Sequence, residues 1–144
     1  MANYECATRT NYFHVKNADD FREFMKRVVS DWDKVDLWEE KDQSGNPIFG
    51  FGCYGSILGV RSQNTDDEDE ELDYDAFVNE LAKHVAIDDA AIILESGHEK
   101  LRYLTGTALV VTRNEQKYIN VEHIAAAEAA KILCNPEWKT RTSY

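Results

Sequence analysis

The chain has 144 residues and a formal net charge of −11, with 43% apolar and 11% aromatic residues. This length and composition are typical of one globular domain with its own core, and they argue against disorder. The acidity disfavours nucleic acid and anionic membranes as direct partners, because both would repel the chain. No apolar run approaches the roughly 20 residues that cross a bilayer, and residues 1–5 do not resemble a secretory signal. We therefore expect a cytoplasmic protein.

The negative charge is concentrated in the middle of the chain. Residues 31–99 carry nineteen acids and four bases, whereas residues 1–30 and 100–144 have net charges of +1 and +3. Residues 66–75 alone hold eight acids and no base. A second acidic group consists of Asp31, Asp33, Asp36, Glu39, Glu40 and Asp42. Such a density of like charge needs either solvent or a positively charged partner.

The first half of the chain predicts a strand, a helix and a hairpin. Residues 4–15 are rich in Tyr, Thr, Phe and Val, which is typical of a strand. Asn17 then fits a helix N-cap, and the apolar residues after it are spaced for one helical face. That face consists of Phe21, Phe24, Met25, Val28 and Val29. Residues 34–42 alternate and residues 48–54 are apolar, so the turn at 44–47 between them predicts a β-hairpin.

The second half predicts a helix, three strands and a last helix. Asp73 fits the N-cap of the first of these helices, and Asn120 fits the N-cap of the last, which ends at Asn135–Pro136. Their apolar faces consist of Tyr74, Phe77, Val78, Leu81 and Val85, and of Val121, Ile124, Ala125, Ala129 and Ile132. Between the helices, a turn is predicted at residues 96–99. The strands are predicted at residues 90–95, 101–112 and 117–120.

These elements predict a single α+β domain over residues 1–136. Their order is β-α-β-β-α-β-β-β-α, and the first six follow the split βαβ, ferredoxin-like order. We expect an antiparallel-rich sheet with helices mainly on one face, an acidic loop at residues 62–73 and a C-terminal tail at residues 137–144. The core is predicted to contain Phe21, Phe24, Val28, Phe77, Leu81 and Ile124.

The sequence offers no strong catalytic or metal-binding motif. The three cysteines, Cys6, Cys53 and Cys134, are odd in number and widely spaced, which indicates free thiols that act as small apolar side chains. A small enzyme could pair Cys53 or Cys6 with His98, yet nothing in the spacing selects such a pair. The acidic run lacks the central glycine of an EF-hand loop, since the sixth residue from Asp66 is Glu71. We expect no metal and no cofactor.

The tryptophans leave two interpretations open. Trp32, Trp38 and Trp138 fit positions at the edge of the core, and they also fit anchors of a protein interface.

Two segments carry a resemblance to other proteins. The segments are Tyr4–Phe13, with the sequence YECATRTNYF, and Glu95–Tyr103, with the sequence ESGHEKLRY. They resemble small proteins carried on phages and mobile elements of Gram-positive bacteria. The resemblance implies a setting of host takeover or anti-defence, in which acidic inhibitors such as anti-CRISPR proteins occur. It transfers no functional residue to this chain.

The leading hypothesis is a non-enzymatic inhibitor whose acidic surface occupies a basic, nucleic-acid-binding site of another protein, such as a CRISPR effector. Carboxylates on a hairpin and a loop can approach the charge density of duplex DNA, so a groove built for phosphates would accept them. The predicted partner-binding residues are Asp36, Glu39, Glu40, Asp42, Asp66, Asp67, Glu68, Asp69, Glu70, Glu71, Asp73 and Asp75. The alternative is an accessory or structural homodimer whose acidity serves only solubility.

Overall fold

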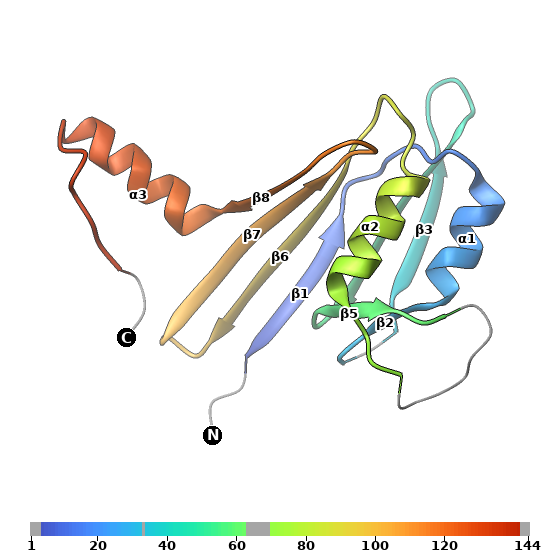
Figure 1. The fold of residues 1–144 in the computed structure, drawn as a ribbon, viewed down its shortest axis with the longest axis horizontal. Coiled ribbons are helices and arrows are strands. Elements are labelled where there is room, and N and C mark those ends of the chain that lie inside the picture. Colours follow the sequence, from blue (N-terminus) through green and yellow to red (C-terminus); the bar gives the residue numbers. More distant parts are fainter. Residues whose placement is uncertain (1–3, 33, 63–69, 142–144) are drawn as a thin grey trace.

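A computed structural model describes residues 4–32, 34–62 and 70–141 of the chain (Figure 1). The helices of this part are α1 (Ala18–Lys26), α2 (Tyr74–His84) and α3 (Val121–Ile132). The strands are β1 (Glu5–Thr10), β2 (Val28–Ser30), β3 (Asp36–Lys41), β4 (Pro47–Tyr54), β5 (Ile57–Val60), β6 (Ala91–Glu99), β7 (Tyr103–Val111) and β8 (Gln116–Asn120).

Six strands form one antiparallel sheet in the order β3-β4-β1-β6-β7-β8. Strand β4 lies between β1 and β3 and is antiparallel to both, so β1 and β3 run parallel to each other. Strand β1 lies between β4 and β6, which likewise run parallel to each other. Because α1 lies between β1 and β3 in the chain and α2 lies between β4 and β6, this part has the split βαβ arrangement of ferredoxin-like domains. The predicted single α+β domain with an antiparallel-rich sheet is confirmed.

The predicted element order lacked two strands, β2 and β5, which form a separate two-stranded sheet. Val28 and Val29, predicted to continue the first helix, pair instead with residues of β5. Helix α1 ends just before Arg27. The Arg27 guanidinium donates to the carbonyl oxygen of Arg61 at 2.7 Å, and the Arg61 N–H donates to the carbonyl oxygen of Arg27 at 2.9 Å. This pairing with a distant segment, together with the β-branched valines, favours a strand. The observed order is β-α-β-β-β-β-α-β-β-β-α.

Strand β6 continues through Ser96–Glu99, where the sequence predicted a turn. Gly97 pairs with Cys6 of β1 and with Thr105 of β7. A Cβ atom on Gly97 would lie 2.6 Å from the Cβ atom of Cys6, so this glycine permits a close approach of neighbouring strands. The turn falls at Lys100, whose φ of 50° lies in the left-handed region.

The predicted N-caps of all three helices are confirmed. The side chains of Asn17, Asp73 and Asn120 each accept a hydrogen bond from a backbone N–H in the first turn of their helix. Such a bond satisfies one of the N–H groups that have no partner inside the helix. The three helix starts are therefore fixed by local sequence.

The core lies between the sheet and the two helices α1 and α2, which cover the same face (Figure 1). Five of the predicted core residues are buried, namely Phe21, Phe24, Val28, Phe77 and Leu81. The rings of Phe24 and Phe77 stack with their centroids 5.9 Å apart, which joins α1 to α2. The sheet contributes Phe49, Phe51, Ala91, Ile93 and Val111.

The prediction that Ile124 joins this core is wrong. Helix α3 follows β8 at the edge of the sheet and extends away from α1 and α2 (Figure 1). Ile124 is 49% exposed, and no residue of α3 is buried. The apolar spacing of α3 is that of a packed helix, but among the described residues only β7 and β8, next to its first turn, lie against it.

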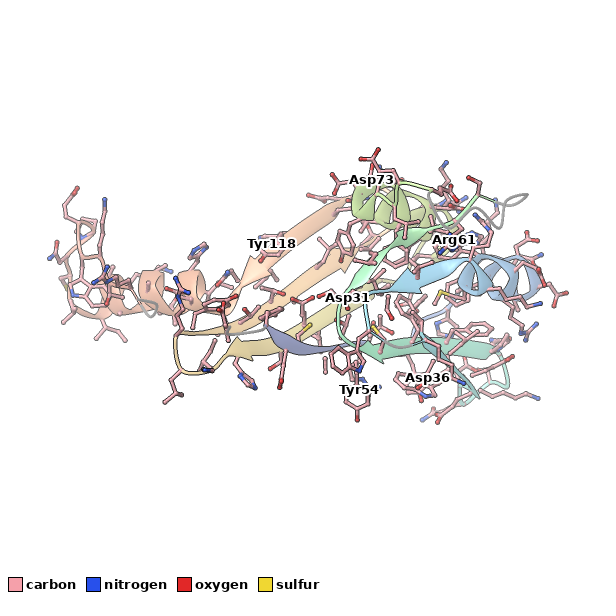
Figure 2. All side chains as sticks on the ribbon, turned by 90° about the horizontal axis from the view of Figure 1, so that it is seen from below. Asp31, Asp36, Tyr54, Arg61, Asp73 and Tyr118 are labelled. Carbon is pink, nitrogen blue, oxygen red and sulfur yellow. The ribbon has the colours of Figure 1, made fainter. Side chains whose placement is uncertain are left out.

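The face of the sheet opposite α1 and α2 carries no helix of the described chain (Figure 2). Paired strand residues point to the same face, so the register defines which side chains lie there. We call this surface the open face. It includes Asp36, Trp38 and Glu40 of β3, Tyr54 of β4, Arg9 of β1, Leu94 and His98 of β6, Leu104 of β7 and Ile119 of β8.

Candidate protein-binding surface

Strand β3 divides its acidic residues between the two faces of the sheet. Asp36 and Glu40 lie on the open face and are exposed. Glu39 points to the opposite face, where both of its oxygens accept hydrogen bonds from Arg22 of α1. The charge of Glu39 is therefore matched within the chain, whereas Asp36 and Glu40 present their carboxylates to solvent.

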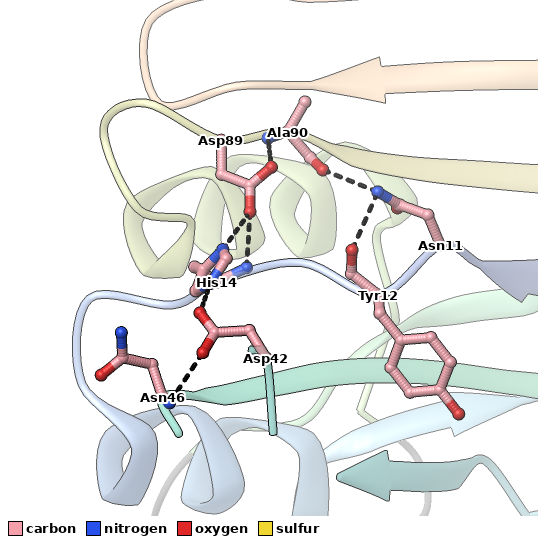
Figure 3. A network of polar contacts seen from close by, with 7 residues as sticks. All are labelled: Asn11, Tyr12, His14, Asp42, Asn46, Asp89 and Ala90. Atoms are coloured by element: carbon pink, nitrogen blue, oxygen red, sulfur yellow. Dashed lines mark hydrogen bonds and ion pairs between the residues drawn. The ribbon is translucent and has the colours of Figure 1, made fainter. Parts of the chain in front are cut away.

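Asp42, at the end of the β3 hairpin strand, belongs to an internal polar network (Figure 3). One of its oxygens accepts from the backbone N–H groups of Ser44 and Asn46, each at 2.9 Å. The other lies 2.8 Å from Nε2 of His14. The second ring nitrogen of His14, Nδ1, lies 2.8 Å from Oδ2 of Asp89, which also accepts the His14 backbone N–H at 2.7 Å. The network ties the β3–β4 turn to the segments before α1 and β6.

In this network, the imidazolium of His14 and the carboxylates of Asp42 and Asp89 favour one another's charged forms. The contacts of its ring with Asp42, and then with Asp89, raise the pKa of His14 because the imidazolium can donate from both ring nitrogens. Contact with His14 lowers the pKa of Asp42. Burial opposes ionisation of Asp89, yet hydrogen bonds from the backbone and ring of His14 outweigh it and lower its pKa. The negative charge of Asp42 thus holds the fold together at this point.

The acidic run is only partly described. Asp66, Asp67, Glu68 and Asp69, like Asp33, lie outside the described residues. Glu70 accepts hydrogen bonds from the backbone N–H and the hydroxyl of Ser62, and Glu71 is exposed. Asp73 caps α2 by accepting the Asp75 N–H at 2.9 Å, and both carboxylates lie at the positive end of that helix.

Among the described acidic residues, Asp31, Asp36 and Asp73 lie at one end of the molecule, but Asp36 and Asp73 do not share a face. Figure 2 looks onto this end and shows Asp36 and Asp73 on opposite sides, with Asp31 and Arg61 between them. A partner would meet these carboxylates around an edge of the domain. Asp36 and Asp73 therefore do not form one flat surface.

At the same end lies a hollow of about 290 Å³ that combines aromatic rings with carboxylates. Trp32, which follows β2, is 82% exposed, and Tyr54, at the end of β4, is 72% exposed. Both line the hollow together with Tyr4, Glu5, Cys6, Asp31 and Gly55. Among the described residues, no lysine or arginine lines it. The lining is therefore suited to a positively charged group, which aromatic faces and carboxylates both attract.

Backbone contacts hold the walls of this hollow in place. The Asp31 carboxylate accepts the N–H of Ser56 at 2.8 Å, and the Ser56 carbonyl accepts the N–H of Asp31 at 3.0 Å. Gly55 follows Tyr54 and has a φ of 94°, in the left-handed region that a glycine adopts without strain. Its N–H donates to the Cys6 carbonyl at 2.8 Å. The segment before β5 is thereby fixed against both β1 and the end of β2.

Of the two largely exposed aromatic residues of this hollow, the sequence indicated Trp32 but not Tyr54. Trp32 was one of three candidate interface anchors, and the structure separates it from the others, because Trp38 and Trp138 are half-buried. Trp38 lies against the guanidinium of Arg9, 5.0 Å from the ring centroid. Tyr54 carried no signal, since its separation from Trp32 along the chain has no helical or strand periodicity.

His98 does not lie on the same face of the sheet as Cys6 or Cys53. His98 points to the open face, while Cys6 and Cys53 point to the face covered by the helices. Burial raises the pKa of the Cys53 thiol to about 11 and also raises the pKa of Cys6, which keeps both thiols protonated at neutral pH. Among the described residues, no group of three or more His, Cys, Asp or Glu side chains is arranged to hold a metal ion.

Comparison with protein-family models, with curated proteins and with solved structures finds no match to this chain. No helix in the described ranges is long and apolar enough to span a membrane.

Proposed function

We propose that this protein is a non-enzymatic binding protein that occupies a basic, nucleic-acid-binding surface of another protein. The observation that supports this best is the hollow between Trp32 and Tyr54, where two exposed aromatic side chains stand beside the carboxylates of Asp31 and Glu5. Large aromatic side chains are enriched among the residues that dominate binding energy at protein interfaces. Carboxylates alone would attract a basic partner, and the aromatic side chains add a surface for close packing.

The proposed binding mode has two parts. The excess of fifteen negative charges over residues 31–99 attracts a basic surface over a long range and sets the association rate. A lysine or arginine side chain of the partner then enters the hollow, between the ring faces and the carboxylates. Asp36 and Glu40, exposed on the open face, and Asp73 and Asp75, at the start of α2, contribute to the steering.

For the biological setting, we propose the one that the resemblance of residues 4–13 and 95–103 to small proteins of phages and mobile elements implies. An acidic protein that blocks a nucleic-acid-binding surface would disable a defence effector in the host cytoplasm. A CRISPR effector is therefore the first partner to examine. Neither nucleic acid nor a membrane is expected to bind the protein directly, because of its net charge.

The proposal is tested by capture followed by competition. The immobilised protein is exposed to bacterial lysate at low salt, bound proteins are eluted with rising salt, and each is purified. The DNA or RNA affinity of the captured protein is then measured by fluorescence anisotropy with and without the acidic chain. We expect the chain to displace the nucleic acid. Binding that leaves the nucleic acid in place would refute the proposed mode.

A set of variants distinguishes the contribution of the hollow to binding from the contribution of the overall negative charge. Replacing Trp32 and Tyr54 by alanine should accelerate dissociation of the complex, because packing is lost while the charge stays the same. Tyr118→Ala is the matched control, since Tyr118 is 62% exposed but lies on β8, outside the hollow. Neutralising four acids of the run (Asp66→Asn, Asp67→Asn, Asp69→Asn, Glu70→Gln) should instead slow association, most strongly at low salt. Identical kinetics for all variants would exclude both parts of the mode.

A further inference from the structure

Helix α3 is apolar on nearly every side, yet it has no buried residue. Of its 12 residues only Glu122, His123, Glu128 and Lys131 are polar. Ile132 is 80% exposed, and Val121 and the following Leu133 are also exposed. A helix that is apolar all round is normally buried, and an isolated helix of this length is only marginally stable in water. The composition of α3 therefore requires a packing partner.

The open face of the sheet offers an apolar surface of suitable size beside α3. Leu94 of β6 pairs with Ala108 of β7, and Leu104 of β7 is 68% exposed. A hollow of about 650 Å³ lies here, lined by Leu104, Gly106 and Val121 among others. α3 is about 18 Å long at 1.5 Å per residue. Strands β6 and β7 extend for about 30 Å at 3.3 Å per residue, so a helix of this length fits along them.

The charges of the chain match the same arrangement. Residues 116–141, which include β8 and α3, carry four bases and three acids, a net charge of +1, whereas residues 31–99 carry −15. We call β8, α3 and the residues up to 141 the C-terminal arm. Because the arm is largely apolar and carries no net negative charge, the acidic body of another copy does not repel it. Within its own copy, α3 extends away from the body instead (Figure 1).

From these observations we infer that the protein forms a two-fold homodimer by exchange of arms, in which α3 of each copy lies on the open face of the other. This inference goes beyond the proposed function and does not depend on it. Two-fold symmetry buries the arm and the sheet face twice, and a stable interface of this kind buries roughly 1,200–2,000 Å² in total. The dimer also gives Ile124 and Ile132 the burial that their spacing predicts.

The test compares oligomeric states by sedimentation velocity over about 1–100 µM, a range that brackets micromolar dissociation constants. The wild type is expected to be a dimer. Ile124→Glu on the arm and Leu104→Glu on the open face should each weaken the dimer at least about tenfold, because each places an unpaired carboxylate in the interface. Ile87→Glu is the matched control, since Ile87 is 70% exposed outside both surfaces, and it should remain dimeric. Circular dichroism confirms that each variant is folded.

Mixing the two variants distinguishes arm exchange from other dimers. In a mixed pair, the arm of the Leu104→Glu copy and the open face of the Ile124→Glu copy are both wild type, so one contact is intact. An equimolar mixture should therefore contain more dimer than either variant forms alone at the same total concentration. A monomeric wild type, a Leu104→Glu variant that stays fully dimeric, or a mixture that stays monomeric would each overturn the inference. The last two results would indicate pairing of the arms with each other or through another surface.

Discussion

Replacing Phe24 by alanine should destabilise the protein by about 3–5 kcal/mol, the range measured when a fully buried phenylalanine is truncated. Phe24 is 1% exposed. Its ring stacks on Phe77 at 5.9 Å and on His84 at 4.8 Å between centroids, and it lies 6.1 Å from the ring of Phe21. The ring joins α1 to α2, so neither helix can move into the cavity without losing its contact with the sheet. We therefore place the loss in the upper half of the range.

The same substitution has a second, independent consequence at His84. Burial lowers the pKa of this imidazole, and the ring of Phe24 forms one wall of its surroundings. Removing the ring admits water, so the pKa of His84 should rise toward the ordinary histidine value. An NMR titration of the histidine ring protons measures this shift directly. An unchanged pKa would show that the cavity collapses or stays dry.

Equilibrium unfolding in urea, followed by circular dichroism, measures the free energy of unfolding of the Phe24→Ala variant. Trp32→Ala serves as the control, because Trp32 is largely exposed and its loss should change stability by less than about 0.5 kcal/mol. Phe24→Leu should fall between the two, since it retains much of the apolar volume. In thermal unfolding, the alanine variant should melt about 9–15 °C lower, at about 3 °C per kcal/mol for a domain of this size. A loss below about 1 kcal/mol would refute the packing between α1 and α2 described above.

Three further predictions concern the polar network, the thiols and the tight strand contact. The raised pKa of His14 means that its ion pairs stabilise the fold fully below the ordinary histidine pKa of about 6.5 and are lost as the pH rises through the raised value. In urea titrations, the stability advantage of wild type over His14→Gln should therefore decrease as the pH rises above about 6.5. A constant difference across pH would contradict this. Alkylation by iodoacetamide at pH 8, followed by mass spectrometry, should modify exposed Cys134 before Cys6 and Cys53, whose pKa values are raised. Equal rates would show that the two partly buried thiols are as accessible as Cys134. Gly97→Ala should destabilise the domain because its Cβ atom would clash with β1, and a melting temperature equal to that of wild type would place β1 and β6 further apart.

The two proposed surfaces are neighbours on the molecule. The aromatic hollow and the larger hollow beside α3 share Glu5 and Cys6 in their linings. A dimer formed through the arms would therefore place each aromatic hollow near the dimer contact, and it would present two acidic surfaces to a partner at once. Comparing partner binding by wild type and by the monomeric Ile124→Glu variant would measure the gain from this bivalency.

The local sequence was sufficient for the elements whose signals are short-range. Asn17, Asp73 and Asn120 start their helices as expected, because a cap bond involves only residues two or three positions apart. The apolar stripe of α2 and the order of the main strands were predicted for the same reason, since periodicity identifies an element and the face it buries. The split βαβ arrangement then follows from element order and short connections.

Only the tertiary structure decided which segments pair and what covers each apolar face. Val28 forms a strand because β5 lies beside it, and Gly97 stays within β6 because β1 approaches it closely. The hollow between Trp32 and Tyr54 depends in the same way on contacts between segments distant in the chain. Ile124 shows the physical limit most clearly. The apolar spacing of a helix indicates that one face requires burial. The spacing is the same whether that face packs against its own domain or against a second molecule, so the sequence alone does not identify the packing partner.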